Sequence, residues 1–444
     1  MKRRAFLQYL AAGTLAGGCG RYLPEDDLME VSIPGFQPRA AQVEITQILW
    51  KAVDLFREKY PEIRIEPASG GGGGYEELML RVMEGNPPDI MSFAGGDTGL
   101  VYSYVEQGHV LDLSAYLQRP SYDTPGASWL ETIDPLYHEA LAYKGRFYAI
   151  PLTVYTLQFY CNKALYERAG ADPNPPTWDC FLDNCERLKR IGVAPITQDG
   201  IHWSTSWWFD HLALRLLGPE KVRQALRDPE RRTKWTEPGF LRAAHMVGEL
   251  LDREYFIAGF SGLNHIESEL LFWQGQAATL FVGNWLTSAR KDIIGEDFRL
   301  YAFPFPGVEG GLGSPHALMG YAGALSIPTR ARHPELAADF LRLLDSRWFQ
   351  EQMVQQVLRV SPLSKVSFPP VHQGLDLILK NKDSFYPFSF GLEGAHPFLY
   401  RQYWDEWNRF MVAREISAEQ LVEGLEDIFA RYYQTVELSP SSML

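Results

Sequence analysis

Aromatic, amide and hydroxyl side chains gather in short runs along this chain. The densest run is His202-Trp203-Ser204-Thr205-Ser206-Trp207-Trp208, and a second run, Asn284-Trp285, follows a short apolar segment. Flat aromatic rings stack on the C–H faces of sugar rings, while amides and hydroxyls form hydrogen bonds with polar groups of a ligand. We expect one Trp of the first run, preferably Trp203, to contact a ligand, with Trp207 as a further candidate. If Trp203 is the contact, Trp207 and Trp208 are expected in the core.

The patterns of common catalytic sites do not occur in the sequence. It has no GxSxG, HExxH or kinase-like set, and His138-Glu139 lacks the second His of a zinc site. Acidic pairs such as Glu76-Glu77 suit a glycosidase only at a defined distance across a bond, which no motif sets here. The five glycines after Ser69 lack the Lys and Ser/Thr of a phosphate loop, so we expect a flexible surface loop. We therefore expect no enzyme, no cofactor and no metal.

Strand-like and helix-like segments alternate in the first part of the chain. Strands are expected at 28–33, 63–65 and 89–93, and helices at 39–60 and 75–83, the first helix with a clear apolar stripe. This alternation predicts an α/β fold with mostly parallel sheets flanked by helices. Phe36 lies in the loop after the first strand. Phe93 and Asp97 lie where the third strand ends, at the sheet edge where α/β folds bind ligands.

The stretch from Tyr143 to Leu188 has strong local signals. Lys144-Gly145-Arg146 predicts a tight turn, followed by strands at 147–153 and 154–161. Asn162 is expected to cap a helix at 163–169 that Gly170 ends. Thr177 is expected to cap the next helix, after two prolines.

This stretch resembles the sugar-binding family 1 of bacterial extracellular solute-binding proteins, which are maltose-binding-protein-like and feed ABC importers. The matching segments are Gly145…Tyr148-Ala149-Ile150-Pro151, Tyr160-Cys161-Asn162-Lys163-Ala164-Leu165-Tyr166-Glu167-Arg168-Ala169-Gly170 and Pro175-Pro176-Thr177-Trp178. Cys161 departs from the aromatic or apolar residue that is usual in the family. Later segments follow in family order, among them Phe272-Trp273-Gln274-Gly275-Gln276-Ala277-Ala278, Gly283-Asn284-Trp285 and Phe303-Pro304-Phe305-Pro306-Gly307. The resemblance extends from about 28 to about 433.

The resemblance implies a two-lobed periplasmic-binding-protein fold of the class II type, with the ligand cleft between the lobes. We expect the first lobe at 28–151 plus 300–345, the second at 152–299 plus 346–436, and a tail at 437–444. Closure by hinge motion is expected at the crossings. Expected ligand contacts among the residues already named are Phe36, Phe93, Asp97, Trp203 and Trp207. The further expected contacts are Tyr155, Asn284, Trp285, Gly320, Tyr321, Arg359 and Trp404.

The N-terminus predicts export. Arg3 and Arg4 stand before an apolar segment too short to span a bilayer, in a pattern that looks like a twin-arginine signal. Ala16-Gly17-Gly18-Cys19 resembles a lipobox, so we expect a signal peptide at 1–19, lipidation of Cys19 and a tether at 20–27. An ordinary cleaved signal with an incidental Cys, and export by the general route, stay open. We expect a periplasmic or cell-surface protein anchored to the membrane by its lipid.

Composition is consistent with an exported globular protein. The 444 residues carry a net charge of −13, which argues against nucleic acid and against docking to anionic lipid. With 46% hydrophobic and 22% charged residues there is ample material for large cores. The four cysteines, Cys19, Cys161, Cys180 and Cys185, show no disulfide framework, and buried free thiols are expected.

The sequence therefore predicts a monomeric substrate-binding protein that captures a mono- or oligosaccharide, glycoside or polyol for an ABC permease. Two alternatives stay open. The same fold could bind a glycerol phosphate, polyamine or peptide, with Arg359 as the only candidate for a phosphate contact. The chain could instead be an exported carbohydrate-active enzyme.

Overall fold

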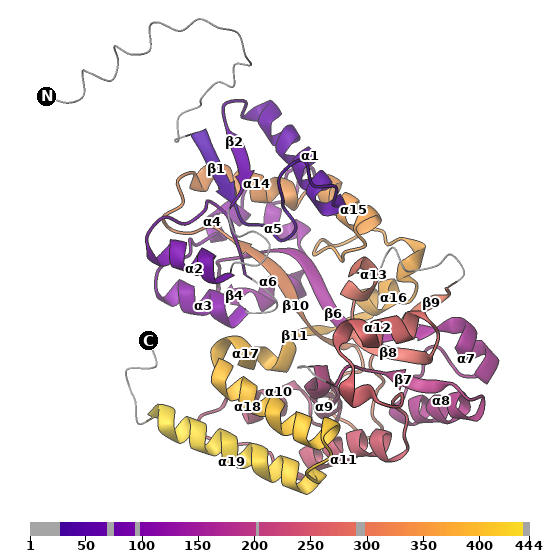
Figure 1. Cartoon of the computed structure of the whole chain (residues 1–444). Helices are drawn as coiled ribbons and strands as arrows, with labels where there is room; N and C mark the ends of the chain where they lie inside the picture. Colours follow the sequence, from indigo (N-terminus) through magenta and orange to yellow (C-terminus); the bar gives the residue numbers. More distant parts are fainter. Residues whose placement is uncertain (1–26, 69–74, 94–97, 201–203, 290–297, 438–444) are drawn as a thin grey trace, which may run out of the picture.

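Two lobes joined by long strands make up the molecule (Figure 1). The computed structural model describes residues 27–68, 75–93, 98–200, 204–289 and 298–437. The export signal with Arg3, Arg4 and Cys19, most of the tether, the glycine run, Asp97 and Trp203 lie outside the described residues.

The first lobe, at the top of Figure 1, combines short strands with a layer of helices. Its strands β1 (Leu28–Val31) and β2 (Arg64–Pro67) are parallel, and Val31 bridges to Ile90 just before β3 (Met91–Phe93). A short hairpin, β4 (Ala142–Tyr143) and β5 (Arg146–Phe147), follows its helices. These helices are α1 (Glu44–Lys59), α2 (Tyr75–Met83), α3 (Thr98–Glu106), α4 (Ser114–Leu117), α5 (Trp129–Thr132), α6 (Pro135–Ala140), α14 (Pro334–Leu344) and α15 (Arg347–Gln356).

The core of the first lobe forms on the apolar stripe of α1. Ile45, Ile48 and Phe56 are buried on that stripe, as its spacing predicts. Phe56 meets Phe340 of α14 edge to face, with ring centroids 5.2 Å apart. A helix near the start of the chain is thus held by one that follows almost 300 residues later.

The second lobe has a larger core that is rich in aromatic side chains. Its strands are β7 (Ala194–Thr197), β8 (Ala277–Gly283), β9 (Leu300–Phe303) and β11 (Ser384–Pro387). The helices in this half of the molecule are α7 (Lys163–Ala169), α8 (Trp178–Arg190), α9 (Ser204–Leu217), α10 (Pro219–Arg227), α11 (Pro238–Asp252), α12 (His265–Trp273), α13 (Trp285–Ala289), α16 (Leu375–Asn381), α17 (Leu392–Ala395), α18 (Pro397–Trp407) and α19 (Ala418–Glu437).

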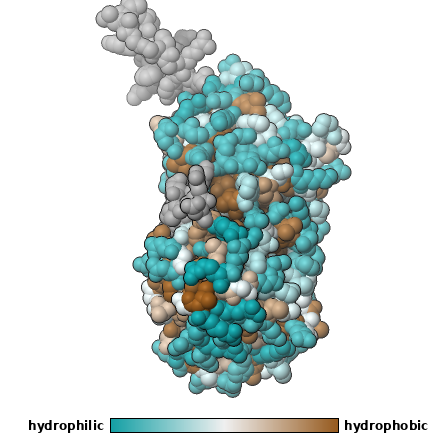
Figure 2. All heavy atoms as spheres, turned by 90° about the vertical axis from the view of Figure 1, so that its right-hand side faces the viewer, coloured by the Kyte–Doolittle hydropathy of each residue, from teal (hydrophilic) through white to brown (hydrophobic). Residues whose placement is uncertain are grey.

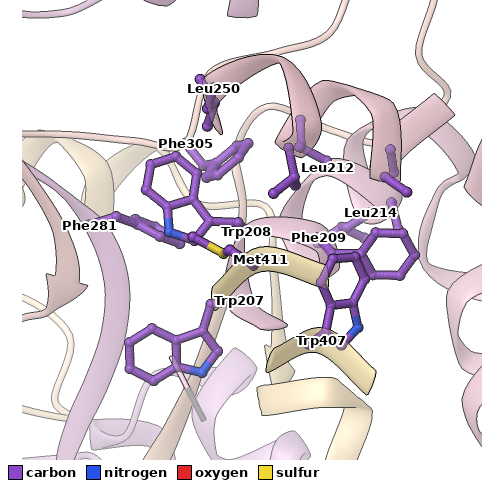
Figure 3. Close-up of a cluster of buried hydrophobic side chains, with 14 of the residues drawn as sticks. Trp207, Trp208, Phe209, Leu212, Leu214, Leu250, Phe281, Phe305, Trp407 and Met411 are labelled. Atoms are coloured by element: carbon purple, nitrogen blue, oxygen red, sulfur yellow. The ribbon is translucent and has the colours of Figure 1, made fainter. Parts of the chain in front are cut away.

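Residues of α9 occupy the centre of that core (Figure 3). The Trp208 ring lies 5.2 Å from that of Phe281 on β8, and the Phe209 ring lies 4.4 Å from that of Trp407 on α18. In Figure 3 the Trp207 side chain lies below Trp208, and its ring is 6.5 Å from that of Phe281 and 5.9 Å from that of Trp285. One helix therefore supplies neighbouring aromatic residues to two different surroundings.

Two long strands run from one lobe to the other. β6 (Ile150–Asn162) and β10 (Ala317–Ser326) pair antiparallel at the centre of a seven-stranded sheet. β6 is rich in β-branched and aromatic residues and is buried on both faces along almost its whole length. The register shifts between Gly323 and Ala324, beside Pro151. Pro has no N–H to donate to the ladder, which favours an irregularity at this point.

The pairing of the crossing strands differs from the parallel arrangement expected from the alternating pattern. β6 pairs antiparallel with β10, β8 and β9, while β10 with β11 and β7 with β8 are parallel. The two strands expected at 147–153 and 154–161 are one continuous strand. A polar interruption would have been needed to break it, and Thr153 and Thr156 are both buried in it.

Two stretches pack in the lobe opposite to the one expected. Phe303 on β9 and Phe305 belong to the second-lobe core, although 300–345 was expected in the first lobe. Phe349 and Met353 on α15 belong to the first-lobe core beside α1, although 346–436 was expected in the second. A strand such as β9, which pairs with the crossing strand β6, and a short helix such as α15 carry no local signal for the core that they join.

The local signals between Tyr143 and Leu188 are confirmed. Lys144 and Gly145 have positive φ angles of 50° and 74° in the β4–β5 turn. The Asn162 side chain accepts hydrogen bonds from the backbone of α7, and Gly170 ends that helix in a left-handed conformation. Thr177 caps α8 through the Cys180 N–H.

The described surface is largely hydrophilic on the face that Figure 2 shows, with small separate hydrophobic areas. Among the described helices, none combines the length and the apolar character needed to cross a membrane. Cys161 and Cys185 are buried free thiols, as expected, whereas Cys180 is exposed because it faces outward from α8.

Candidate functional site

Five aromatic side chains from distant parts of the chain meet where the crossing strands pass between the lobes. We call them the aromatic cluster: Tyr155, Trp207, Trp285, Tyr321 and Phe388. All are half-buried except Trp207, which is 1% exposed. Half-buried aromatic residues in a connected group present flat apolar faces that a ligand can cover.

The two tyrosines of the aromatic cluster form its floor. Tyr155 on β6 pairs directly with Tyr321 on β10, and their rings stack with centroids 4.6 Å apart and an angle of 28° between their planes. Gly320 lets the strands approach, because a Cβ there would lie 1.9 Å from the Tyr155 carbonyl oxygen. Within the otherwise buried run of β6, Tyr155 is the residue left partly open.

Trp285 forms one wall of the aromatic cluster. Its ring lies 6.1 Å from that of Tyr155 and 5.9 Å from that of Trp207. A Cβ on Gly283 would lie 1.9 Å from the Trp285 ring, so only glycine lets the indole fold back over the end of β8. Asn284 is 3% exposed and donates its amide hydrogen to the Val154 carbonyl oxygen at 3.0 Å. Asn284 thus ties the Trp285 turn to β6.

A network of polar side chains lies behind Trp285. The indole Nε1 of Trp285 donates to His265 Nε2 at 3.2 Å. His265 Nε2 in turn lies 3.0 Å from Glu269 Oε1. Asp199, at the end of β7, accepts hydrogen bonds from Gln198 Nε2 at 2.7 Å and from Ser204 Oγ. Glu269 and Asp199 are each 1% exposed. The two carboxylates are therefore buried behind Trp285, whereas the half-buried His265 lies beside it, with ring centroids 6.2 Å apart.

Arg359 brings a positive charge to the floor. It directly precedes Val360, which bridges to Val154 on β6. Burial raises the pKa of the Tyr321 phenol, Tyr155 adds to this effect, and the charge of the half-buried Arg359 opposes it. Tyr321 therefore stays protonated at neutral pH and can both donate and accept a hydrogen bond.

The structure brings together several of the predicted site residues and separates others from them. Tyr155, Trp207, Trp285, Gly320 and Tyr321 meet in one place, with Asn284 and Arg359 beside them. Phe36 is 2% exposed and packs against Trp50 in the first-lobe core, so it is no part of this cluster.

The other predicted contacts lie elsewhere or are only partly described. Trp404 is half-buried and its ring packs on Tyr400, 4.5 Å away, on α18. The backbone of Phe93 pairs with Ala324 of β10. Asp97 and Trp203 lie outside the described residues.

Sequence reasoning missed Asp199, His265, Glu269 and Phe388. Asp199 had a usable signal, because it follows the strand at 194–197, at the kind of sheet edge where Asp97 was expected from the sequence. His265 and Glu269 are four residues apart on α12, which places them on one helix face. Phe388 had no signal, because its placement depends on an unusual backbone turn described below.

The arrangement is suited to binding a ligand. It brings flat rings and hydrogen-bonding groups together at the junction of the lobes. Within the described residues, no group of three or more His, Cys, Asp or Glu could hold a metal ion.

Comparisons with known proteins agree on one family. The family model described as "Bacterial extracellular solute-binding protein" matches residues 40–347. A protein of Mesorhizobium japonicum named "Probable sugar-binding periplasmic protein" is 26% identical over 247 residues, covering 54% of this chain and 55% of that protein. A Pyrococcus horikoshii protein named an uncharacterized ABC transporter extracellular-binding protein is 24% identical over 301 residues, covering 66% and 64%. The match thus spans between half and two thirds of these relatives' length.

Solved structures share the fold over nearly the whole chain. A "Chitin oligosaccharide binding protein" superposes with a TM-score of 0.72 at 22% identity, covering 92% of this chain and 99% of that one. The solute-binding protein RafE, solved with raffinose, has a TM-score of 0.68 at 18% identity, covering 91% and 99%. The two-lobed α/β fold is therefore confirmed. With the family model matching well over half of its length, the chain belongs to the bacterial extracellular solute-binding proteins.

Proposed function

We propose that this chain is the substrate-binding protein of an ABC importer and that it captures a mono- or oligosaccharide, or a related glycoside or polyol, at the aromatic cluster. The observation that carries the proposal is the stacked Tyr155–Tyr321 pair walled by Trp285, at the junction of the lobes. Relatives named for sugar binding and for ABC transport support the solute class and the partner.

The proposed mechanism is capture without chemistry. A sugar ring lies on the aromatic faces, and its hydroxyls bond to Tyr321 and to the half-buried His265. The lobes then close by bending where β6 and β10 cross, and the closed form is presented to the permease. The binding site returns its ligand unchanged.

A ligand panel tests this proposal. Chito-oligosaccharides, raffinose, xylo-oligosaccharides, monosaccharides and polyols are added to the purified protein, and the melting temperature is followed. A ligand that binds only the folded state raises the melting temperature with its concentration. Chromatography of the sugars after incubation should show no products. Absence of any shift across the panel would contradict the sugar proposal, and cleavage products would indicate an enzyme.

Arg359 supports a second candidate, an anionic ligand in the same fold. The charge of its half-buried guanidinium acts on Tyr321, and it could pair with the phosphate of a glycerol phosphate bound there. The same panel includes glycerol phosphates, polyamines and peptides. Stabilisation by glycerol phosphates alone, and its loss in Arg359→Met, would favour this candidate.

We propose that the protein is an exported, monomeric lipoprotein anchored through Cys19. Arg3-Arg4 before a short apolar segment and the small residues before Cys19 support this. Mass spectrometry of the N-terminus and membrane fractionation of wild type and Cys19→Ser test it. Lipid on the wild type and release of the variant are expected, and an unmodified Cys19 would contradict the anchor. Size-exclusion chromatography with light scattering tests the monomer.

A further inference from the structure

Three successive residues after β11 have left-handed backbone conformations. The φ and ψ angles are 42° and 36° at Ser389, 52° and 32° at Phe390, and 75° and 21° at Gly391. Glycine adopts this region freely, but residues with a Cβ rarely do. Two such residues in a row persist only where their surroundings hold them, and such conformations are concentrated at functional positions.

A buried carboxylate holds this left-handed turn. Asp210 on α9 accepts a hydrogen bond from Ser389 Oγ at 2.7 Å and one from Tyr403 Oη at 2.5 Å. Ser389 and Asp210 are 0% and 1% exposed. From the other side, Arg227 Nη1 donates to the Phe390 carbonyl oxygen at 3.3 Å. Side chains from three helices of the second lobe thus fix the turn.

The turn sets the position of the residue before it. The Phe388 ring lies 5.4 Å from that of Trp207 and 5.5 Å from that of Tyr321, nearly perpendicular to the latter at 72°. Trp207 and Asp210 lie three residues apart on α9, so one helix supplies both a ring of the aromatic cluster and the anchor of the turn. Any ligand on the tyrosine floor would meet the half-buried Phe388 at its side.

The turn also sets the helix that follows it. α17 begins at Leu392, directly after Gly391, and packs against α3 of the first lobe (Figure 1). A shift of the turn would therefore move a ligand wall and a contact between the lobes together. A flexible loop at this place would fix neither the ligand wall nor the contact between α17 and α3.

We propose that Phe388 contacts the bound ligand as a specificity-determining wall, and that Asp210, through Ser389, is the positioning residue that holds it there. This inference rests on the proposed function, because it assigns two further residues to the same site. The ligand class stays that of the sugar panel.

Four variants of the full chain test the proposal by calorimetric titration with chitobiose, raffinose and xylobiose. Phe388→Ala is expected to weaken binding of the tightest of these about tenfold or more, at an unchanged fold by circular dichroism. Phe398→Ala is the matched control, because Phe398 is 80% exposed on α18, away from the aromatic cluster. Its affinity is expected to equal that of the wild type.

Ser389→Ala and Ser389→Gly separate positioning from general stability. Both lose the hydroxyl bonded to Asp210, but glycine accepts the left-handed conformation and alanine does not. Ser389→Ala is expected to weaken binding at a temperature far below its melting point, and Ser389→Gly to recover most of the affinity. A merely structural Ser389 would lower the melting temperature of both and leave the dissociation constant unchanged.

The outcomes distinguish this inference from the function on which it rests. If the wild type binds one of the sugars and Phe388→Ala binds it equally well, the wall is wrong and the function stands. If the alanine and glycine variants of Ser389 both bind with the wild-type dissociation constant, the positioning role is wrong. If the wild type binds no sugar or polyol of the full panel, the proposed function fails and the inference fails with it.

Discussion

Trp208 and Trp285 are the same residue type in two different surroundings. Trp208 is 0% exposed and is enclosed by Phe159, Phe256 and Phe281 in the second-lobe core. Trp285 is half-buried and shares its space with tyrosines, a histidine and, by our proposal, a ligand. In a chain this rich in aromatic residues, a ring's surroundings and not its type decide whether it stabilises the fold or binds.

Replacing the core ring should have the largest effect. Trp208→Ala removes an enclosed indole and leaves a cavity, so the free energy of unfolding should fall by about 3–5 kcal/mol. Chemical denaturation followed by circular dichroism measures this loss. Trp285→Ala serves as the comparison and should lose much less, because part of its surface already faces solvent. An equal loss of unfolding free energy in both variants would contradict the distinction between a core ring and a binding ring.

The buried acids of the two lobes offer the next contrast. Burial raises the pKa of Asp345 to about 8, against one hydrogen bond from Trp129, and raises that of Asp210 to about 6, against two from Ser389 and Tyr403. Both groups favour folding in the protonated form. Their contribution is complete below the unfolded pKa of 3.8 and is lost as the pH rises through the folded value.

Asp345→Asn should therefore remove most of the pH dependence of the unfolding free energy that these two acids cause. Asp210→Asn should remove a smaller part, because the pKa of Asp210 is raised less. Between about pH 5.5 and about pH 7.5 the wild type should lose about 2 kcal/mol of stability through Asp345, at about 1 kcal/mol per unit. Urea denaturation across this range measures the slope. A slope that persists in Asp345→Asn would show that Asp345 is ionised in the folded protein.

Trp285→Ala should weaken sugar binding by about 1–2 kcal/mol, roughly a five- to thirtyfold rise in Kd, because stacking and apolar contact are lost. Titration calorimetry with the best ligand of the panel measures it. Trp404→Ala, with a half-buried ring packed on Tyr400, is the matched control and should bind as the wild type does. Unchanged binding in Trp285→Ala would remove this ring from the site.

Cysteine labelling gives the smallest effect, a difference in rate with no change in stability. Burial raises the pKa of the Cys161 and Cys185 thiols, so both react slowly in the folded protein. Cys180 is exposed and should be alkylated by iodoacetamide first. Peptide mapping by mass spectrometry assigns the label. Equal labelling of Cys161 would show that β6 opens readily.

Features set by neighbouring residues could be predicted from the sequence. The caps at Asn162 and Thr177 and the stripe on α1 depend on side chains within one or two turns, and the structure has them as predicted. The lobe of α15 and the direction of β6 pairing depend on residues far away in the chain. No local sequence pattern indicates which distant residues α15 and β6 will contact.

The aromatic cluster divides in the same way. Tyr155, Trp285 and Tyr321 were predicted as ligand contacts from the family resemblance. The structure brings them together, and their contact with a ligand stays a prediction. Phe388 could not be predicted, because its position depends on the left-handed turn at Ser389 and Phe390. Neither Ser nor Phe is a residue type that favours a left-handed backbone. Phe36 resembled a loop aromatic residue but fills the first-lobe core beside Trp50.

The crossing strands also constrain the order in which the chain can fold. β6 is complete at Asn162, but its partners begin only at Ala277, Leu300 and Ala317. Until those strands leave the ribosome, a long apolar strand has unpaired edges that favour association with other chains. Closing such distant pairings is slow, because the chain between them must lose entropy first. Both lobes must therefore complete their sheet late in synthesis, and a nascent chain stalled before Ala317 should be the form most prone to aggregate.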